Sequence, residues 1–361
     1  MRNIDDPDTI LSVRGLEITF KTDQGDRVFL RDVDFDIRQG EVLGVVGESG
    51  SGKSITALSL MGLLPNSGRV TAGEALFQGQ DLLAMTSKQL DNIRGKHLAM
   101  IFQDALTSLN PVLTIGNQIV EAIRAHQYIS KSKATKLAAD LVARVGLANP
   151  KTVLEQYAHT LTGGMRQRVM IAIALAGEPS IVIADEATSS LDVTIQAQIM
   201  HLLRELSLER NMSVMLITHD IGLIAQMADQ VLVMYAGEIV ENTDVFTMFE
   251  APGHPYTRAL LDTVPSIDDD KDRELLAIPG VVPDDYYAIN SCRFAGRCEF
   301  AQQQCRETRQ IMKPLDDCRE VRCMRAQNNE LAFVYSQQCE ASKIALARRK
   351  KEKESFSGDK R

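Results

Sequence analysis

Hydrophobic and polar residues alternate with different periods along the chain, and the pattern predicts strands followed by helices. Residues 11–20 and 28–37 carry β-favouring side chains in partial alternation, with a glycine-aspartate pair between them that suits a hairpin loop. Residues 41–47 (EVLGVVG) form a short apolar run that ends at glycine. The apolar spacing of residues 54–64 (SITALSLMGLL) then predicts a helix. This part of the chain should therefore fold as strand, tight loop and helix.

Further apolar runs predict a parallel sheet. Residues 104–160 are mostly helical by pattern, with Pro111 and Pro150 as breaks. Strands are expected at residues 181–185, 213–218 and 230–235, separated by helical segments such as 195–209. Strands that alternate with helices favour a parallel sheet wrapped by helices.

Composition changes this picture little but limits where the protein works. The chain has 361 residues, of which 44% are apolar and 24% charged, so an ordinary globular make-up is expected. No stretch approaches the roughly 20 apolar residues that span a bilayer, and the first ten residues do not resemble a signal peptide. We therefore expect a cytosolic protein. The formal net charge of −8 argues against general nucleic-acid binding, which usually needs a basic surface.

A phosphate-binding loop is the strongest local signal. It fits G-x-x-x-x-G-K-[ST] and comprises Gly47, Glu48, Ser49, Gly50, Ser51, Gly52, Lys53 and Ser54. Glycines let the backbone curl until its N–H groups and the following helix N-terminus face phosphate oxygens. Lys53 would pair with the β- and γ-phosphates and Ser54 would hold Mg²⁺. The alternative is a plain glycine turn between a strand and a helix.

Two carboxylates end a later apolar run. Residues 181–186 read IVIADE, so Asp185 and Glu186 close a predicted strand. Adjacent side chains on a strand point to opposite sides, so the two acids can take different roles. Asp185 would reach the Mg²⁺ shell, while Glu186 would activate the attacking water as a general base. The alternative is a pair of solvated acids at a strand end.

Four further motifs give the chain a resemblance to the ABC ATPases. Residues 161–168 (LTGGMRQR) resemble the family's signature motif, with threonine at Thr162 where serine is usual. Gln103 resembles the Q-loop glutamine, residues 190–192 (SLD) resemble the D-loop, and His219 resembles the switch histidine. With the phosphate loop and the acidic strand end, these motifs stand in the family's order over residues 11–245. The resemblance implies an ATPase that pairs head-to-tail with a second ATPase subunit.

The resemblance also implies roles for these residues. Thr162, Gly163, Gly164 and Asp192 would face the ATP held by the partner subunit, and Gln103 would reach the Mg²⁺ shell and the catalytic water. His219 would contact the γ-phosphate, although a strand-end histidine bonded to nearby backbone is the alternative. Phe20 would stack on adenine, or else be a core phenylalanine of the first strand.

Other stretches resemble the dipeptide and oligopeptide importers. These are residues 100–103 (MIFQ), 107–111 (TSLNP), 253–261 (GHPYTRALL) and 278–280 (IPG), followed by a cysteine-rich segment. The resemblance implies ATP-driven peptide import at the cytoplasmic face of a bacterial inner membrane. The implied partners are a paralogous ATPase subunit, two permease subunits and an extracytoplasmic peptide-binding protein, with no nucleic acid. A nickel, opine or antimicrobial-peptide importer, an exporter, and a soluble ABC ATPase of DNA repair or translation are the alternatives.

Six cysteines occur near the C-terminus. In a reducing compartment they are more readily metal ligands or free thiols than disulfides. Cys292, Cys298, Cys305 and Cys323 do not have the close pairs of a zinc ribbon. Resemblance to the peptide importers implies a [4Fe–4S] cluster on these four residues, with zinc and plain thiols as alternatives. Cys318 could replace Cys323, and Cys339 is left over.

The expected fold class is α/β. Resemblance implies an ABC-type P-loop domain with a RecA-like core, an antiparallel β subdomain, a helical subdomain after Gln103 and a small Cys-rich C-terminal module. The expected boundaries are residues 8–262 for the ATPase domain, 263–327 for a linker and the Cys-rich module, and 328–361 for a charged, disordered tail.

Overall fold

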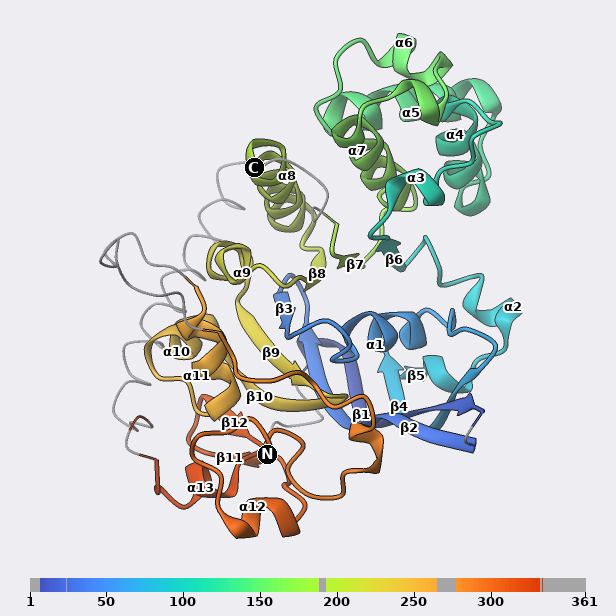
Figure 1. Cartoon of the computed structure of the whole chain (residues 1–361). Coiled ribbons are helices and arrows are strands. Elements are labelled where there is room, and N and C mark those ends of the chain that lie inside the picture. The colour runs from blue at the N-terminus through green and yellow to red at the C-terminus, as the bar shows by residue number, and fades with distance from the viewer. Residues whose placement is uncertain (1–6, 24, 188–192, 265–276, 332, 334–361) are drawn as a thin grey trace. The chain divides into compact units, whose positions relative to one another are not determined.

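The computed structural model describes residues 7–23, 25–187, 193–264, 277–331 and 333 (Figure 1). The chain divides into two compact units. The first unit comprises residues 1–38, 42–84 and 219–361, and the second comprises residues 39–41 and 85–218.

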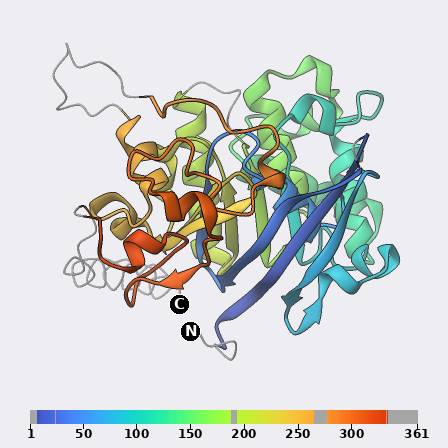
Figure 2. The ribbon, with the colours of Figure 1, turned by 60° about the horizontal axis from the view of Figure 1, so that its bottom comes forward.

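An antiparallel sheet begins the first unit. The long strands β1 (Thr9–Thr22) and β2 (Gly25–Arg38) pair along their whole length, which Figure 2 shows in blue. β4 (Gly68–Phe77) pairs with the other side of β1, and β5 (Gln80–Asp81) pairs with β4. One face is apolar because alternate residues point the same way: Leu11, Val13, Leu16 and Ile18 are fully buried.

A second sheet of the first unit carries the phosphate loop. β3 (Val42–Val46) pairs in parallel with β9 (Gln230–Tyr235). Antiparallel strands then follow in the order β10 (Glu238–Asp244), β12 (Arg319–Val321) and β11 (Lys313–Pro314). All residues of β3 and β9 are buried, as expected of strands covered on both faces. The C-terminal segment therefore extends the sheet that bears the phosphate loop.

Short helices complete the first unit. They are α1 (Lys53–Leu60), η1 (Leu82–Ala84), α9 (Ile221–Met227), α10 (Val245–Glu250), α11 (Pro255–Asp262), η3 (Tyr286–Ala288), α12 (Gln303–Glu307) and α13 (Met324–Gln327). α11 begins at the GHPYT stretch, where Pro255 occupies the first turn and His254 is the N-cap. A proline fits there because its missing N–H would have no partner inside the helix.

The second unit consists of a parallel sheet and a helical region. Its strands lie in the order β8 (Ser213–Ile217), β7 (Ile181–Asp185) and β6 (Leu98–Ile101). Its helices are α2 (Ser87–Leu90), α3 (Ala105–Ser108), α4 (Ile115–His126), α5 (Lys131–Arg144), α6 (Pro150–Glu155), η2 (Ala158–Thr160), α7 (Gly163–Ala174) and α8 (Val193–Arg210). In the described part of the chain, none of the helices has the length and apolar character needed to cross a bilayer.

The predicted α/β class and the antiparallel β subdomain are confirmed. The helical stretch predicted over residues 104–160 contains α3 to α6, and Pro150 begins α6. The pattern did not predict β4, in which only Ala75 and Phe77 are buried, or the pairing of β10 with the C-terminal segment. Residues 265–276 and the tail beyond 333 lie outside the described residues, so the predicted linker and tail stay predictions.

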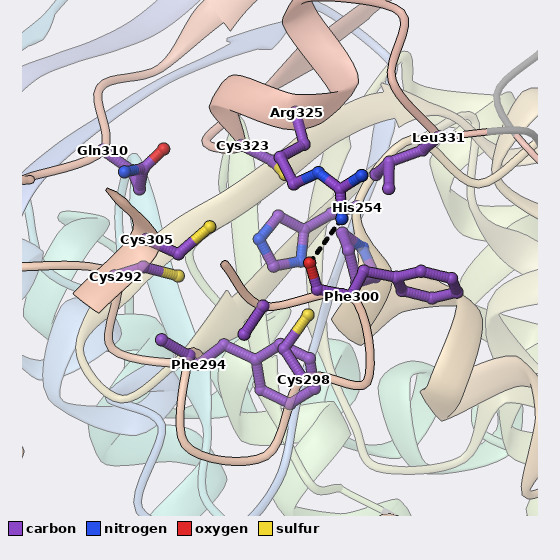
Figure 3. Close-up of a pocket in the computed structure, with 13 residues that line it drawn as sticks. His254, Cys292, Phe294, Cys298, Phe300, Cys305, Gln310, Cys323, Arg325 and Leu331 are labelled. Carbon is purple, nitrogen blue, oxygen red and sulfur yellow. Dashed lines mark hydrogen bonds between the residues drawn. The ribbon is translucent and has the colours of Figure 1, made fainter. Parts of the chain in front are cut away.

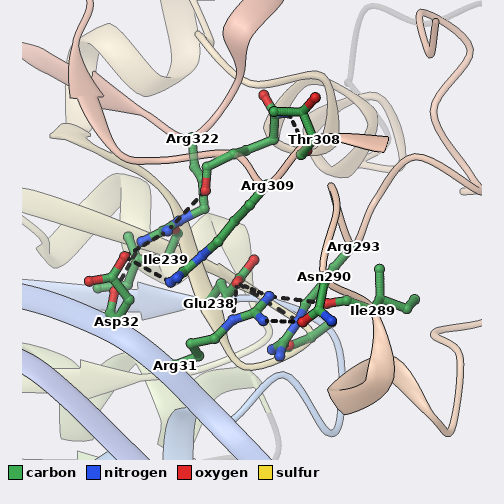
Figure 4. Close-up of polar contacts among 12 residues, drawn as sticks. Arg31, Asp32, Glu238, Ile239, Ile289, Asn290, Arg293, Thr308, Arg309 and Arg322 are labelled. Carbon is green, nitrogen blue, oxygen red and sulfur yellow. Dashed lines mark hydrogen bonds and ion pairs between the residues drawn. The ribbon is translucent and has the colours of Figure 1, made fainter. Parts of the chain in front are cut away.

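Buried arginines attach the C-terminal segment to β2 and β10 (Figure 4). Arg322 donates to the carboxylate of Asp32 at 3.1 Å, to its backbone oxygen at 2.9 Å and to Ile239 O at 2.8 Å. Arg31, on β2, binds Glu238 of β10 through Nε at 2.9 Å and Nη2 at 2.8 Å, and its Nη2 also donates to Ile289 O of the C-terminal segment at 3.1 Å. Since an unpaired buried charge is costly, each arginine is held by several acceptors at once.

We expect Arg322→Ala to lower the free energy of unfolding by about 2–3 kcal/mol, because buried acceptors lose their charged donor. Arg309→Ala is the matched control: Arg309 pairs with the same Asp32 carboxylate at 3.3 Å, but its side chain is 44% exposed against 2% for Arg322. The control should cost no more than about 0.5 kcal/mol. Urea unfolding followed by circular dichroism measures both, and equal losses would contradict the burial argument.

Candidate functional site

The phosphate loop connects β3 to α1 in a conformation that needs glycine. Gly52 is the N-cap of α1 with a φ of 102°, and a Cβ on it would lie 2.2 Å from Leu30 Cδ2. A Cβ on Gly47 would lie 2.1 Å from Met234 O. Side chains are therefore excluded at both positions by contact as well as by backbone conformation. Lys53 and Ser54 are the first two residues of the eight-residue helix α1. A helix N-terminus that follows such a loop is a typical anion site.

The side chain of Lys53 lies inside this loop and is 5% exposed. Its Nζ donates to Gly47 O at 2.8 Å and to Glu48 O at 3.0 Å. Ser51 N also donates to Glu48 O, at 3.2 Å. The loop backbone therefore curls around a buried ammonium, whose charge can attract phosphate oxygens. Ser49 and Gly50 form the exposed rim of the loop, and Ser54 is half-buried.

Residues distant in sequence hold this loop from outside. The Tyr256 hydroxyl accepts from Glu48 N at 2.9 Å, and Arg297 binds both carboxylate oxygens of Glu48 at 2.9 and 3.1 Å. Gly237 N donates to Ser51 O at 3.0 Å. The sequence reasoning assigned no chemistry to Tyr256 and did not consider Arg297. In the sequence, Tyr256 is the tyrosine of the GHPYT stretch and Arg297 directly precedes Cys298, and these two positions are the features that could have drawn attention to them.

Phe20 lies beside other aromatic residues of the first unit. Its ring is 5.0 Å from that of Phe29, edge to face, and Phe29 lies 5.9 Å from Tyr286. Phe20 is half-buried, and a Cβ on Gly68 would touch its ring at 2.8 Å. The Phe20 ring is thus only partly covered by its neighbours. Adenine stacking on Phe20 stays a prediction.

The second unit brings Gln103 and Glu186 together. Gln103 Nε2 donates to Glu186 Oε2 at 2.7 Å. Asp185 ends β7 and is 7% exposed, while Glu186 has a φ of 45° and donates its N–H to Ile217 O at 2.9 Å. A carboxylate oriented by an amide, at the carboxyl end of a parallel strand, can accept a proton from water. A non-glycine residue in the left-handed region often marks a functional position.

The signature residues begin α7. Thr162 is its N-cap, and the hydroxyl oxygen accepts from Met165 N at 3.3 Å. Threonine therefore performs the capping role that serine would. The exposed Gly163 and the half-buried Gly164 form the first turn of a twelve-residue helix, whose amides and dipole suit an anion. Asp192 lies outside the described residues.

His219 belongs to the first unit and is exposed. It directly precedes Asp220, the N-cap of α9, whose carboxylate accepts from Gly222 N at 2.8 Å and Leu223 N at 3.2 Å. Its predicted contact with a γ-phosphate stays a prediction.

Four free cysteines line a cavity in the C-terminal segment (Figure 3). They are Cys292, Cys298, Cys305 and Cys323. Burial, with the neighbouring cysteines, raises the pKa of Cys292 to about 12 and that of Cys298 to about 11. Backbone N–H groups of Phe294 and Phe300 act in the opposite direction on these two thiols. Within the described residues, no three His, Cys, Asp or Glu side chains stand in geometry ready for a metal ion.

Cys318 does not belong to this set. It is disulfide-bonded, so the expectation that the cysteines avoid disulfides, and that Cys318 could replace Cys323, is wrong for this residue. Cys339 lies outside the described residues.

His254 lines the same cavity but is committed to backbone contacts. Its Nδ1 accepts from Tyr256 N at 3.0 Å, and burial lowers its pKa to about 3. The buried Glu241 carboxylate accepts from Gly253 N at 2.7 Å and His254 N at 2.8 Å. The GHPYT stretch is therefore fixed by hydrogen bonds, and it delivers Tyr256 to the phosphate loop.

Comparisons with known proteins identify the family. A family model described as ABC transporter matches residues 30–189, and one described as oligopeptide/dipeptide transporter, C-terminal region, matches residues 240–305. The chain is similar to the dipeptide transport ATP-binding protein DppD of Escherichia coli (strain K12), with 46% identity over 314 residues that cover 87% of this chain and 96% of that protein.

A second relative and a solved structure agree. The oligopeptide transport ATP-binding protein OppD of Bacillus subtilis (strain 168) is 46% identical over 302 residues, covering 81% of this chain and 84% of OppD. The dimeric post-hydrolysis state of the ATP-binding cassette MJ0796, bound to ADP and Pi, superposes with a TM-score of 0.59 at 27% identity. The superposition covers 65% of this chain and 98% of the MJ0796 chain. The ABC ATPase fold is thereby confirmed.

We expect Lys53→Ala to abolish tight ATP binding, because it removes the buried cation that the loop encloses. Calorimetry on the full chain measures the affinity. Lys88→Ala, which removes an exposed lysine of α2, is the control and should bind as the wild type does. Unchanged affinity in Lys53→Ala would contradict the phosphate-loop assignment.

Proposed function

The chain belongs to the ATP-binding proteins of the dipeptide and oligopeptide ABC transporters, and we propose how its residues perform ATP hydrolysis and which assembly they serve. The observation that carries this function is the 46% identity across 96% of a dipeptide transport ATP-binding protein. The match of residues 240–305 to the transporter family's C-terminal region supports the same class. The chain is thus an ATP-hydrolysing subunit of a peptide importer.

The first unit binds the triphosphate in this proposal. The amides of the phosphate loop, with Gly47 and Gly52 at its corners, face the phosphates, and Lys53 neutralises the β- and γ-phosphate charge. The Ser54 hydroxyl would hold Mg²⁺, and Asp185 and Gln103 would supply further oxygen donors, which suit this ion. Phe20 would stack on the adenine ring.

Hydrolysis depends on Glu186. Its carboxylate would take a proton from the attacking water as that water approaches the γ-phosphate. The hydrogen bond from Gln103 Nε2 at 2.7 Å supports this role, because it orients the carboxylate that must receive the proton. His219 would contact the γ-phosphate and register its loss.

A second ATPase subunit completes each site. Gly163 and Gly164 at the exposed start of α7, with Thr162 and Asp192, would complete the site on the ATP held by the partner. ATP then favours the closed pair, and hydrolysis reopens it, so nucleotide state biases the permease. A permease and a substrate-binding protein are implied by the importer class, and we propose two permease subunits, a paralogous ATPase and an extracytoplasmic peptide-binding protein.

Location and cargo follow from this assembly. The subunit would sit at the cytoplasmic face of a bacterial inner membrane, held there by the permease. Di- and oligopeptides are the proposed cargo, because the similar proteins are named for dipeptide and oligopeptide transport. The ATPase domain would span residues 8–262 and the C-terminal module residues 263–327.

We also propose a [4Fe–4S] cluster on Cys292, Cys298, Cys305 and Cys323. Four free thiols line one cavity, and its described lining contains no carboxylate. Cys292, Cys298, Cys305 and Cys323 come from separate turns of the C-terminal segment, so four thiolate ligands could reach one cluster from several sides. Bound there, a cluster would supply a covalent tie between separate loops of the C-terminal segment.

The proposed hydrolytic role is tested with Glu186→Gln in the transporter reconstituted with its permease and binding protein. We expect unchanged ATP binding and a fall of about 10²–10⁴-fold in peptide-stimulated hydrolysis, since a positioned base contributes this much. Hydrolysis within a few-fold of the wild type would contradict the role of Glu186. Stimulation by nickel or an opine but not by peptides would contradict the cargo.

The cluster predicts a brown protein. After anaerobic purification the chain should contain about four irons and absorb near ~400 nm. Serine at any of the four cysteines should remove the colour, whereas Cys318→Ser, in the same segment, should retain it. Stoichiometric zinc or metal-free thiols in the colourless wild type would refute the cluster.

A further inference from the structure

We infer that Arg297 is a positioning residue for ATP binding, because it clamps the carboxylate of Glu48 and so fixes the loop that encloses Lys53. The inference rests on the ATP-binding function given above. It does not depend on the transported cargo or on what the cysteines hold.

Glu48 is the second residue of the phosphate loop, and each of its polar groups has a hydrogen-bond partner. Its N–H donates to the Tyr256 hydroxyl at 2.9 Å. Its backbone oxygen accepts from Ser51 N at 3.2 Å and from Lys53 Nζ at 3.0 Å. Its carboxylate accepts from Arg297. The position of Glu48 therefore determines where an acceptor of the Lys53 ammonium lies.

Arg297 contacts Glu48 and two backbone oxygens at once. Its side chain is 8% exposed. Nη1 binds both carboxylate oxygens of Glu48, while Nε donates to Pro279 O at 2.7 Å and Nη2 donates to Gly280 O at 3.3 Å. A planar guanidinium with several fixed donors can bind a carboxylate and backbone oxygens together, which a lysine cannot reproduce.

The clamp also has an electrostatic effect on the nucleotide. The Glu48 carboxylate is a negative charge on a residue of the phosphate loop, and it would repel a polyphosphate if it stood alone. Arg297 is 8% exposed and the Glu48 side chain is 28% exposed, so the pair is partly shielded from water and neutralises this charge more effectively than a fully solvated pair would. Loss of Arg297 should thus weaken ATP binding in two ways, through loop freedom and through an unpaired negative charge.

A second arginine of the same loop supports this arrangement. Arg293, four residues before Arg297, donates to Ala236 O. The next residue, Gly237, donates its N–H to Ser51 O at 3.0 Å. The loop between Cys292 and Cys298 therefore contacts the phosphate loop directly through Arg297 and indirectly through Arg293. Contacts at two points favour a role in positioning the loop over a chance surface ion pair.

The test measures binding of a fluorescent ATP analogue to the full-length chain. Arg297→Ala should raise its Kd by about tenfold, as expected when one partner of a largely buried charged pair is removed. Adding Glu48→Gln to Arg297→Ala should recover only the part of this loss that the unpaired carboxylate causes, because the loop stays unclamped in the double variant. In the assembled transporter, the KM for ATP should rise while kcat changes by less than about twofold, because Arg297 acts through the loop and not on the reacting atoms.

A purely structural role is distinguished by controls. Arg309→Ala removes an exposed arginine of the same C-terminal segment and should leave the Kd unchanged. Should Arg297→Ala fail to fold, Arg297→Lys retains the charge but not the fixed donors of the guanidinium, and it should weaken binding about threefold; wild-type affinity in this variant would contradict the clamp.

Two results would overturn the clamp. One is wild-type affinity in Arg297→Ala, and the other is additivity, in which the double variant binds more weakly than Arg297→Ala by the full loss that Glu48→Gln causes alone. Lys53→Ala separates this failure from that of the nucleotide site. If Lys53→Ala loses ATP while Arg297→Ala retains it, only the clamp is wrong. If Lys53→Ala itself binds normally, the nucleotide site is wrong and the clamp falls with it.

Discussion

A single buried ammonium organises the nucleotide-binding part of this protein. Lys53 is 5% exposed, and its Nζ is held by the backbone oxygens of Gly47 and Glu48. A buried cation without partners would cost several kcal/mol, so the loop must keep its curled shape around it. That shape in turn requires glycine at Gly47 and Gly52, where a Cβ would meet Met234 O or Leu30. The same curled backbone therefore both encloses the Lys53 ammonium and requires the two glycines, and contacts from the rest of the first unit hold this backbone in place.

The supports of this loop come from sequence positions far beyond it. Tyr256 lies 208 residues from its partner Glu48, and Arg297 lies 249 residues from it. Bringing such distant segments together costs closure entropy, although that cost grows only slowly with length. Buried contacts offset it: β12 pairs with β10, and Arg322 binds Asp32 and Ile239 in the first unit. The C-terminal segment is thereby fixed to the same sheet that presents the phosphate loop.

Local patterns predicted the elements whose residues are contiguous in sequence. The glycine-rich loop, the apolar strand before Asp185 and the helix after Thr162 each have their signal within a short window, because the backbone conformation itself demands those residue types. What the sequence could not supply was pairing between distant segments. Nothing local marks Arg297 as the partner of Glu48, and a single arginine before a cysteine has many ordinary explanations. The disulfide at Cys318 was missed for a related reason, since the compartment argument applies to cysteines in general and not to one residue.

The division of roles in the cysteine-bearing loop follows from side-chain chemistry. Cys292 and Cys298 line the cavity. Arg293, which follows Cys292, donates to a backbone oxygen. Arg297, which precedes Cys298, donates to a backbone oxygen and to the Glu48 carboxylate. A loop this short cannot move one set without the other, because proteins are packed too densely for the two sides of a loop to shift independently. Anything that orders the cysteines therefore also orders the arginines. The C-terminal segment thus contacts the phosphate loop through Arg297, although Arg297 belongs to no phosphate-binding motif.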